Sequence, residues 1–160
     1  MSTRRRRIVL LALGNDILGD DAAGLAAAET LRGEFEHDVD VVASGEAGLA
    51  LLDILAGYEF ALLVDSISTG RVPPGTILEY TDKDFQKVVG PSPHYAGLPE
   101  VIKLARHLGI DFPRQVRVLA LEIAPPMDFR ETLSPAITEA MSPYVDRAAT
   151  ILRGWLAATP

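Results

Sequence analysis

The sequence predicts an α/β fold: a three-layer αβα sandwich around a five-stranded, largely parallel, twisted sheet. Short apolar runs alternate along the chain with segments of helical periodicity, which is typical of repeated βα units. The first run, IVLLAL at 8–13, is apolar throughout, as expected for a strand covered on both faces. The 160 residues, 48% hydrophobic and 23% charged, are expected to form a single domain over 1–160, with 1–6 as a flexible basic lead-in.

The first half of the chain should contain three strands separated by two helices. In order, the expected strand, helix, strand, helix and strand lie at 8–13, 21–32, 39–43, 47–56 and 60–66. The first helix places Leu25, Ala28 and Leu31 on one face, and Gly33 is expected to end it.

The second half should add an edge strand, a helix, a strand and a long final helix. These elements are expected at 75–80, 98–108, 116–123 and 134–155. The strand at 75–80 follows Pro73 and Pro74, which favours a place at the edge of the sheet. The helix after it should bury a face that includes Leu98 and Leu108, and Gly109 should end it.

Composition excludes several function classes. The net charge of −7 argues against nucleic-acid binding, which needs a basic face. The chain has no cysteine, so a metal would need His, Asp, Glu or backbone oxygen ligands. Arg4 to Arg7 precede an apolar run too short for an export signal, and no run approaches the roughly 20 residues of a membrane helix. A cytoplasmic protein, monomeric or weakly oligomeric, is expected.

Polar residues collect where the first and third strands are expected to end, the edge at which such sheets bind ligands. Asp16, Asp20 and Asp21 follow the first strand, Asp65 ends the third, and His94 precedes the helix at 98–108. Structural roles are open for three of them: Asp20 as a helix N-cap, Asp21 as a partner of the helix dipole, and Asp65 as the start of an Asx-turn. Together, carboxylates and an imidazole suit a divalent transition metal.

Other sites compete with a metal site. The glycines of GNDILGDDAAG do not match a dinucleotide-binding loop, and the aspartates would repel a pyrophosphate. A phosphoacceptor receiver domain also combines acidic residues after strands one and three. It needs a lysine at the end of the last strand, however, where this chain has Glu122. Glu122 either lines the cleft or caps the sheet, and His37 and His107 are weaker candidates for function.

Three blocks of the sequence resemble the signature blocks of the nickel-iron hydrogenase maturation endopeptidases. They are LGNDILGDDAAG at 13–24, LLVDSI at 62–67 and SPHYAGLPEVIKLARHLG at 92–109. The resemblance implies a five-stranded, largely parallel sheet between helices. It also implies an enzyme that removes a C-terminal extension from the hydrogenase large-subunit precursor after nickel insertion.

The resemblance assigns metal contact and catalysis to Asp21, Asp65 and His94, with nickel presented by the substrate rather than tightly bound by the protease. Asp16 and Asp20 are second choices. Many relatives carry Asp-Gly-Gly-Thr after the second strand, whereas this chain has Ala-Ser-Gly-Glu at 43–46. The alternative function is a non-enzymatic phosphoacceptor or metal-sensing module on a similar fold.

Overall fold

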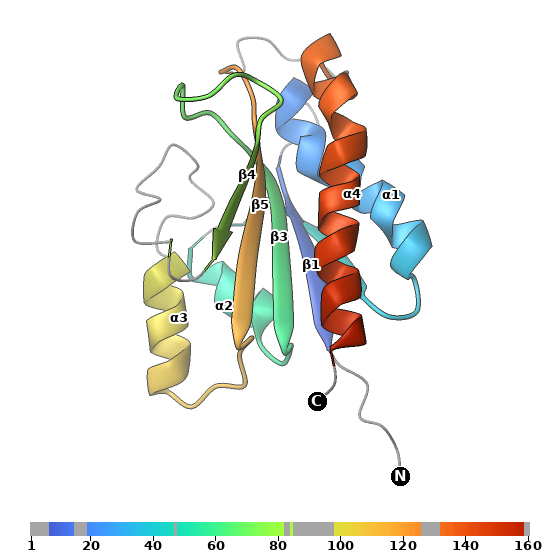
Figure 1. The fold of residues 1–160 in the computed structure, drawn as a ribbon. Helices are drawn as coiled ribbons and strands as arrows, with labels where there is room; N and C mark the ends of the chain where they lie inside the picture. Colours follow the sequence, from blue (N-terminus) through green and yellow to red (C-terminus); the bar gives the residue numbers. More distant parts are fainter. Residues whose placement is uncertain are drawn as a thin grey trace.

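The computed structural model contains one five-stranded sheet in the order β2-β1-β3-β5-β4, and it describes residues 7–14, 19–46, 48–81, 84, 98–125 and 132–158 (Figure 1). The strands are β1 (Ile8–Leu13), β2 (Asp40–Ser44), β3 (Phe60–Ile67), β4 (Ile77–Thr81) and β5 (Gln115–Glu122). The pairings of β1 with β2, β1 with β3, and β3 with β5 are parallel, whereas β4 runs antiparallel to β5 at an edge. These pairings confirm the predicted fold class and the predicted edge strand.

Helices cover both faces of this sheet. They are the 3-10 helix η1 (Gly19–Ala22) and the α-helices α1 (Ala23–Phe35), α2 (Ala50–Leu55), α3 (Leu98–His107) and α4 (Pro135–Ala157). Helices α1 and α4 pack on one face and α2 and α3 on the other, each over its own apolar cluster (Figure 1). None of the helices in the described ranges is long and apolar enough to cross a membrane.

Two helix ends differ from the sequence prediction. Helix α1 continues past Gly33 to Phe35, because the buried Phe35 side chain anchors the last turn while Gly33 faces solvent. Helix α3 ends at His107, so Leu108 lies beyond it and is 59% exposed rather than buried. Gly109 does end α3: it has φ +66° and donates to the Arg106 carbonyl, as in a Schellman motif.

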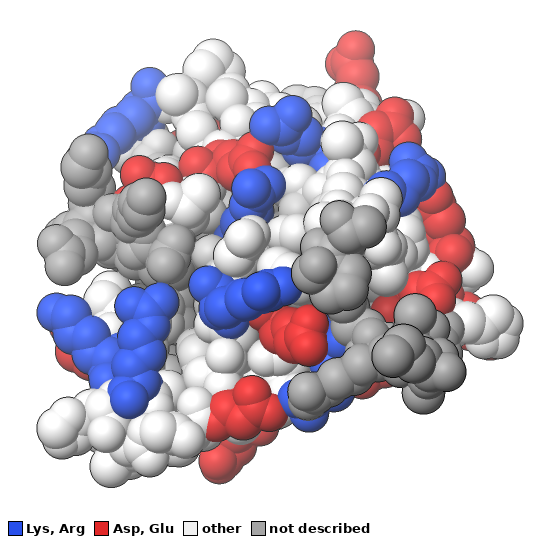
Figure 2. Space-filling model, turned by 60° about the horizontal axis from the view of Figure 1, so that its bottom comes forward, with Lys and Arg blue, Asp and Glu red and all other residues white. Residues whose placement is uncertain are grey.

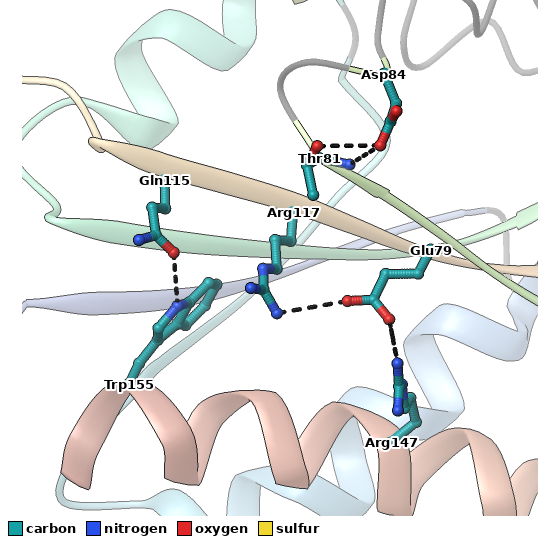
Figure 3. Close-up of polar contacts among 7 residues, drawn as sticks. All are labelled: Glu79, Thr81, Asp84, Gln115, Arg117, Arg147 and Trp155. Atoms are coloured by element: carbon teal, nitrogen blue, oxygen red, sulfur yellow. Dashed lines mark hydrogen bonds and ion pairs between the residues drawn. The ribbon is translucent and has the colours of Figure 1, made fainter. Parts of the chain in front are cut away.

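Helix α4 is fixed on the sheet by polar contacts as well as by its apolar face. Glu79 of β4 pairs with Arg147 of α4 at 2.6 Å and with Arg117 of β5 at 3.4 Å (Figure 3). Nearer the end of α4, the Trp155 indole N–H donates to the Gln115 side-chain oxygen at 3.1 Å (Figure 3). These contacts tie α4 to the two strands at this side of the sheet.

Charges of both signs are interspersed on the side shown in Figure 2. Arg7 pairs with Asp111 at 2.8 Å, and both side chains are substantially exposed. Arg153 likewise pairs with Glu34 across the α4 and α1 helices. Exposed pairs of this kind typically contribute about 0–1 kcal/mol each, so the apolar clusters, not these pairs, account for most of the stability.

Tyr58 and Asp40 join the start of β3 to the start of β2. The Tyr58 hydroxyl donates to Asp40 Oδ2 at 2.8 Å. Burial first, and then the hydrogen bond and charge of Asp40, raise the pKa of Tyr58 to about 12 from its ordinary value of 10.0. Folding therefore favours the neutral phenol. This contribution to stability is complete below pH 10.0 and is lost as the pH rises through about 12.

We predict that Tyr58 ionises near pH 12 in the folded protein. The measurement is the tyrosinate absorbance of the wild type minus that of Tyr58→Phe, followed during an alkaline titration. An Asp40→Asn variant removes the charge but keeps an oxygen acceptor, so its Tyr58 should ionise at lower pH. Ionisation of Tyr58 near pH 10.0 in the wild type would contradict the assignment.

Candidate active site

The carboxyl ends of β1 and β3 form the topological switch point of the sheet. From β1 the chain passes through α1 to β2 on one side, whereas β3 lies on the other side of β1. In open α/β sheets, the crevice outside such a point is the usual place for a ligand. The sequence prediction of a site after strands one and three therefore agrees with the topology.

Asp65 is fully buried within the carboxyl-terminal part of β3, with 0% of its surface exposed. Side chains alternate along a strand, so Asp65 shares a face with Leu63 and Ile67, the face covered by α2 and α3. Asp65 Oδ1 accepts the N–H of Ser66 at 2.8 Å. The strand continues to Ile67, so Asp65 does not start an Asx-turn at the strand end.

Tyr144 of α4 holds the Asp65 backbone from the opposite face of the sheet. The Tyr144 hydroxyl accepts the N–H of Asp65 at 3.1 Å and donates to the Leu119 carbonyl of β5 at 2.6 Å. Tyr144 is fully buried, and burial, then the nearby charge of Asp65, raise its pKa well above the ordinary value. The phenol therefore remains a neutral donor and acceptor while the protein is folded. Sequence reasoning did not identify Tyr144.

Gly24 brings the first turn of α1 directly onto the ends of β1 and β3. A Cβ atom placed on Gly24 would lie 2.6 Å from the Val64 carbonyl oxygen and 3.0 Å from that of Leu13. The preceding turn η1, which contains Asp20 and Asp21, contacts β3. The backbone of Asp21 is thereby placed near the strand that carries Asp65.

The structure corrects the predicted role of Asp20 as a helix N-cap. Helix α1 begins at Ala23 with Ala22 in the N-cap position and no side-chain capping bond, and Asp20 lies inside the preceding turn η1. The first turn of α1 itself has no acidic residue. Asp21 likewise lies in η1, directly before α1 and not within its first turn.

Glu122, the last residue of β5, is a buried carboxylate at the same edge of the sheet, with 1% of its surface exposed. Its Oε1 atom accepts three hydrogen bonds, from the N–H of Thr69 at 2.8 Å, the Thr69 hydroxyl at 2.8 Å and the N–H of Gly70 at 2.9 Å. Glu122 therefore fastens the loop that follows β3. The sequence placed Glu122 at the strand end but did not indicate these contacts.

The remaining candidates are two positions of the sequence prediction that the structure does not describe and two histidines that it does. Asp16 and His94 fall outside the described residues. His37 follows the end of α1 and precedes β2, and His107 is in the last turn of α3 before β5, so both lie at the amino edge of the sheet, away from Asp65. Within the ranges that the structure describes, no group of three or more His, Cys, Asp or Glu side chains could hold a metal ion.

The segment after β2 and the strand order bear on two of the sequence predictions, the altered sequence at 43–46 and the phosphoacceptor alternative. The Ala-Ser-Gly-Glu sequence at 43–46 begins within β2, and Ser44 Oγ accepts the N–H of Glu46 at 3.0 Å. The strand order 2-1-3-5-4, with one antiparallel strand, differs from the order 2-1-3-4-5 of the receiver fold. The topology therefore does not support the phosphoacceptor alternative.

Comparison with known proteins points to one family. The sequence model of the family "Hydrogenase maturation protease" matches residues 25–151. The chain is 30% identical over 153 residues to the hydrogenase expression/formation protein HoxM of Cupriavidus necator, covering 92% of this chain and 75% of that protein. It is 26% identical over 151 residues to the hydrogenase 2 maturation protease of Escherichia coli, covering 92% and 91%.

Solved structures agree with this grouping. The hydrogenase maturating endopeptidase HybD of Escherichia coli superposes with a TM-score of 0.74 and 25% identity, over 92% of this chain and 93% of that one. The [NiFe] hydrogenase maturation protease HybD of Thermococcus kodakarensis has the same fold, with a TM-score of 0.70, 24% identity and coverage of 91% and 99%. The chain belongs to the hydrogenase maturation protease family and is a peptidase.

Proposed function

We propose that the protein is an endopeptidase that removes the C-terminal extension of a nickel-iron hydrogenase large-subunit precursor after nickel has been inserted. The match of the hydrogenase maturation protease model to residues 25–151 carries this proposal. The buried carboxylate of Asp65 at the switch point supplies the chemistry at the place where the fold binds ligands. The proposed partner is the precursor, and the proposed compartment is the cytoplasm.

Nickel belongs to the substrate in this proposal, and Asp21, Asp65 and His94 contact it. The burial of Asp65 and the contact of η1 with β3 support the first two assignments, whereas His94 is proposed from the sequence alone. Oxygen and nitrogen ligands suit nickel. A ligand set that is complete only when the substrate is bound would recognise the nickel of the substrate without removing it.

Cleavage requires a water molecule activated against the scissile carbonyl group. Two groups are available for this step: the metal of the substrate as a Lewis acid, or an aspartate as a general base. In both routes the aspartate carboxylate must be ionised, either to contact the metal or to accept a proton from water.

The proposal predicts that purified protein cleaves the nickel-loaded precursor and leaves the nickel-free precursor intact. Asp21→Asn, Asp65→Asn and His94→Ala should each lower the cleavage rate by about 100-fold or more, since each removes a group from the reacting centre. His107→Ala, at the amino edge, is the control and should cleave at the wild-type rate. Mass spectrometry of the precursor measures both the site and the rate of cleavage. Unimpaired processing by all three variants would overturn the site assignment.

A further inference from the structure

Glu122 lies on the same face of the sheet as Asp65, one strand away. Asp65 pairs with Ala120 in the parallel register of β3 and β5, and Ile67 pairs with Glu122. Ala120 and Ile67 both belong to the apolar cluster under α2 and α3, so Asp65 and Glu122 project toward that side. Neighbouring strands lie about 4.8 Å apart and each residue rises about 3.3 Å, which places the two Cα atoms about 8 Å apart.

One oxygen atom of the Glu122 carboxylate, Oε1, already has its hydrogen-bond partners. Oε1 accepts all three donors from Thr69 and Gly70. The backbone of Glu122 is also fixed, since its N–H donates to the Thr76 carbonyl at 2.9 Å and its carbonyl accepts the N–H of Gly75 at 2.8 Å. The carboxylate is therefore held in one orientation before any ligand arrives.

The other oxygen atom of the carboxylate, Oε2, has no hydrogen-bond partner. Oε2 of Glu122 is buried and accepts no hydrogen bond, and it is the only such buried side-chain atom among the described residues. A buried carboxylate oxygen without a partner costs free energy, so native proteins nearly always fill such a position with a donor, a water molecule or an ion. This oxygen, on the same face as the buried Asp65 carboxylate, favours a positively charged occupant because two buried like charges repel each other.

We propose that Glu122 Oε2 is a metal-binding atom that, together with Asp65, forms an oxygen pair for a divalent cation. The separation of about 8 Å between the two Cα atoms is one that two carboxylate side chains and a cation between them can span. The pair alone leaves most of the coordination sphere open. The identity of the cation as the nickel carried by the substrate rests on the proposed function, whereas the binding of a divalent cation to this pair does not.

Two variants separate metal binding from the structural role of Glu122. In Glu122→Gln, the three donors hold the amide oxygen in the place of Oε1, so the amide NH2 group replaces Oε2 and repels a cation. Thr69→Val removes one donor to Oε1 and leaves Oε2 unchanged. Glu122→Gln should therefore weaken metal binding, whereas Thr69→Val should weaken the attachment of the loop after β3 to Glu122.

The experiment is a titration of the full-length protein with Ni²⁺ up to millimolar concentration, read by paramagnetic broadening of backbone amide signals. Broadening centred on Asp65 and Glu122 is expected in the wild type. Glu122→Gln should weaken the affinity about tenfold or more, and Thr69→Val should change it much less. Absence of broadening near these residues in the wild type, or equal affinity in Glu122→Gln, would overturn the proposal.

Processing of the nickel-loaded precursor by the same proteins distinguishes this proposal from the proposed function. Under the proposal, Glu122→Gln raises KM for the nickel-loaded precursor, while its denaturant midpoint stays near that of the wild type. If wild-type protein binds Ni²⁺ through Glu122 but cleaves no hydrogenase precursor, the proposed function fails and the metal site stands. If wild-type protein cleaves the precursor and Glu122→Gln binds Ni²⁺ and cleaves equally well, the metal site fails and the proposed function stands.

Discussion

Replacing Gly24 with alanine is expected to lower the free energy of unfolding by about 2–3 kcal/mol. The new methyl group would lie 2.6 Å from the Val64 carbonyl oxygen and 3.0 Å from that of Leu13. Both are backbone atoms of central strands, so neither can move aside as a flexible side chain would. Helix α1 must instead shift away from the sheet, which outweighs the roughly 1 kcal/mol that alanine contributes over glycine inside a helix.

Gly33 provides a matched control in the same helix. A Cβ atom at Gly33 meets nothing within 4 Å. Gly33→Ala should therefore raise the free energy of unfolding by about 0.5–1 kcal/mol, the ordinary gain from alanine in an exposed helical position. Chemical denaturation of the two variants and the wild type measures both effects. Equal stability of Gly24→Ala and Gly33→Ala would show that the close approach of α1 to the sheet has no energetic consequence.

The displacement of α1 should also reach the site. Turn η1 is continuous with α1 and contacts β3, so a shift of the helix moves the backbone of Asp21 relative to Asp65. A displacement of about 1 Å at a reacting centre can lower a rate by about 100-fold. At a temperature where Gly24→Ala remains folded, its cleavage of the nickel-loaded precursor should fall far more than that of Gly33→Ala. Normal cleavage by folded Gly24→Ala would contradict this coupling.

The strands were predictable because burial on both faces leaves a direct trace in the sequence. The runs that form β1 and β3 are apolar almost throughout, and every residue of both strands is buried. The edge position of β4 was also predictable, since two prolines directly precede its strand pattern.

Helix ends were less predictable because contacts distant in sequence decide them. Gly33 is a typical stop signal, but the burial of Phe35 continues α1 beyond it. Leu108 continues the apolar spacing of α3, yet the Schellman hydrogen bonds around Gly109 end the helix at His107. The glycine rule was therefore overridden by packing at α1, whereas at α3 it was correct and only the last residue of the helix differed.

The candidate site was predictable only in part for the same reason. Asp65 could be identified because it directly follows an apolar run, and its position at the switch point agrees with the prediction. Tyr144 could not, because its hydroxyl contacts Asp65 across 79 residues of sequence and from the opposite face of the sheet. For Glu122, the position at the strand end was visible, but the three donors to one oxygen depend on how the following loop folds back.

Tyr144→Phe is expected to lower the free energy of unfolding by about 1–3 kcal/mol. The substitution removes the hydroxyl but keeps the ring, so the packing of α4 on the sheet is preserved. The N–H of Asp65 and the Leu119 carbonyl each lose the hydrogen bond to this hydroxyl, in a place that water does not reach. Tyr58→Phe is the control, since it removes one hydrogen bond to the exposed Asp40 and should cost less.

The Tyr144→Phe variant should also process the precursor more slowly, even where it is fully folded. The hydroxyl fixes the backbone that carries the Asp65 carboxylate, so Tyr144 acts as a positioning residue and the loss should appear mainly in kcat. A variant that merely loosened the fold would instead recover full activity at low temperature. A Tyr144→Phe protein with lowered stability but unchanged kcat and pH profile would show that Asp65 is held in place by β3 alone. An unchanged stability would show that the backbone groups find other partners, because a buried N–H left without an acceptor cannot be free of cost.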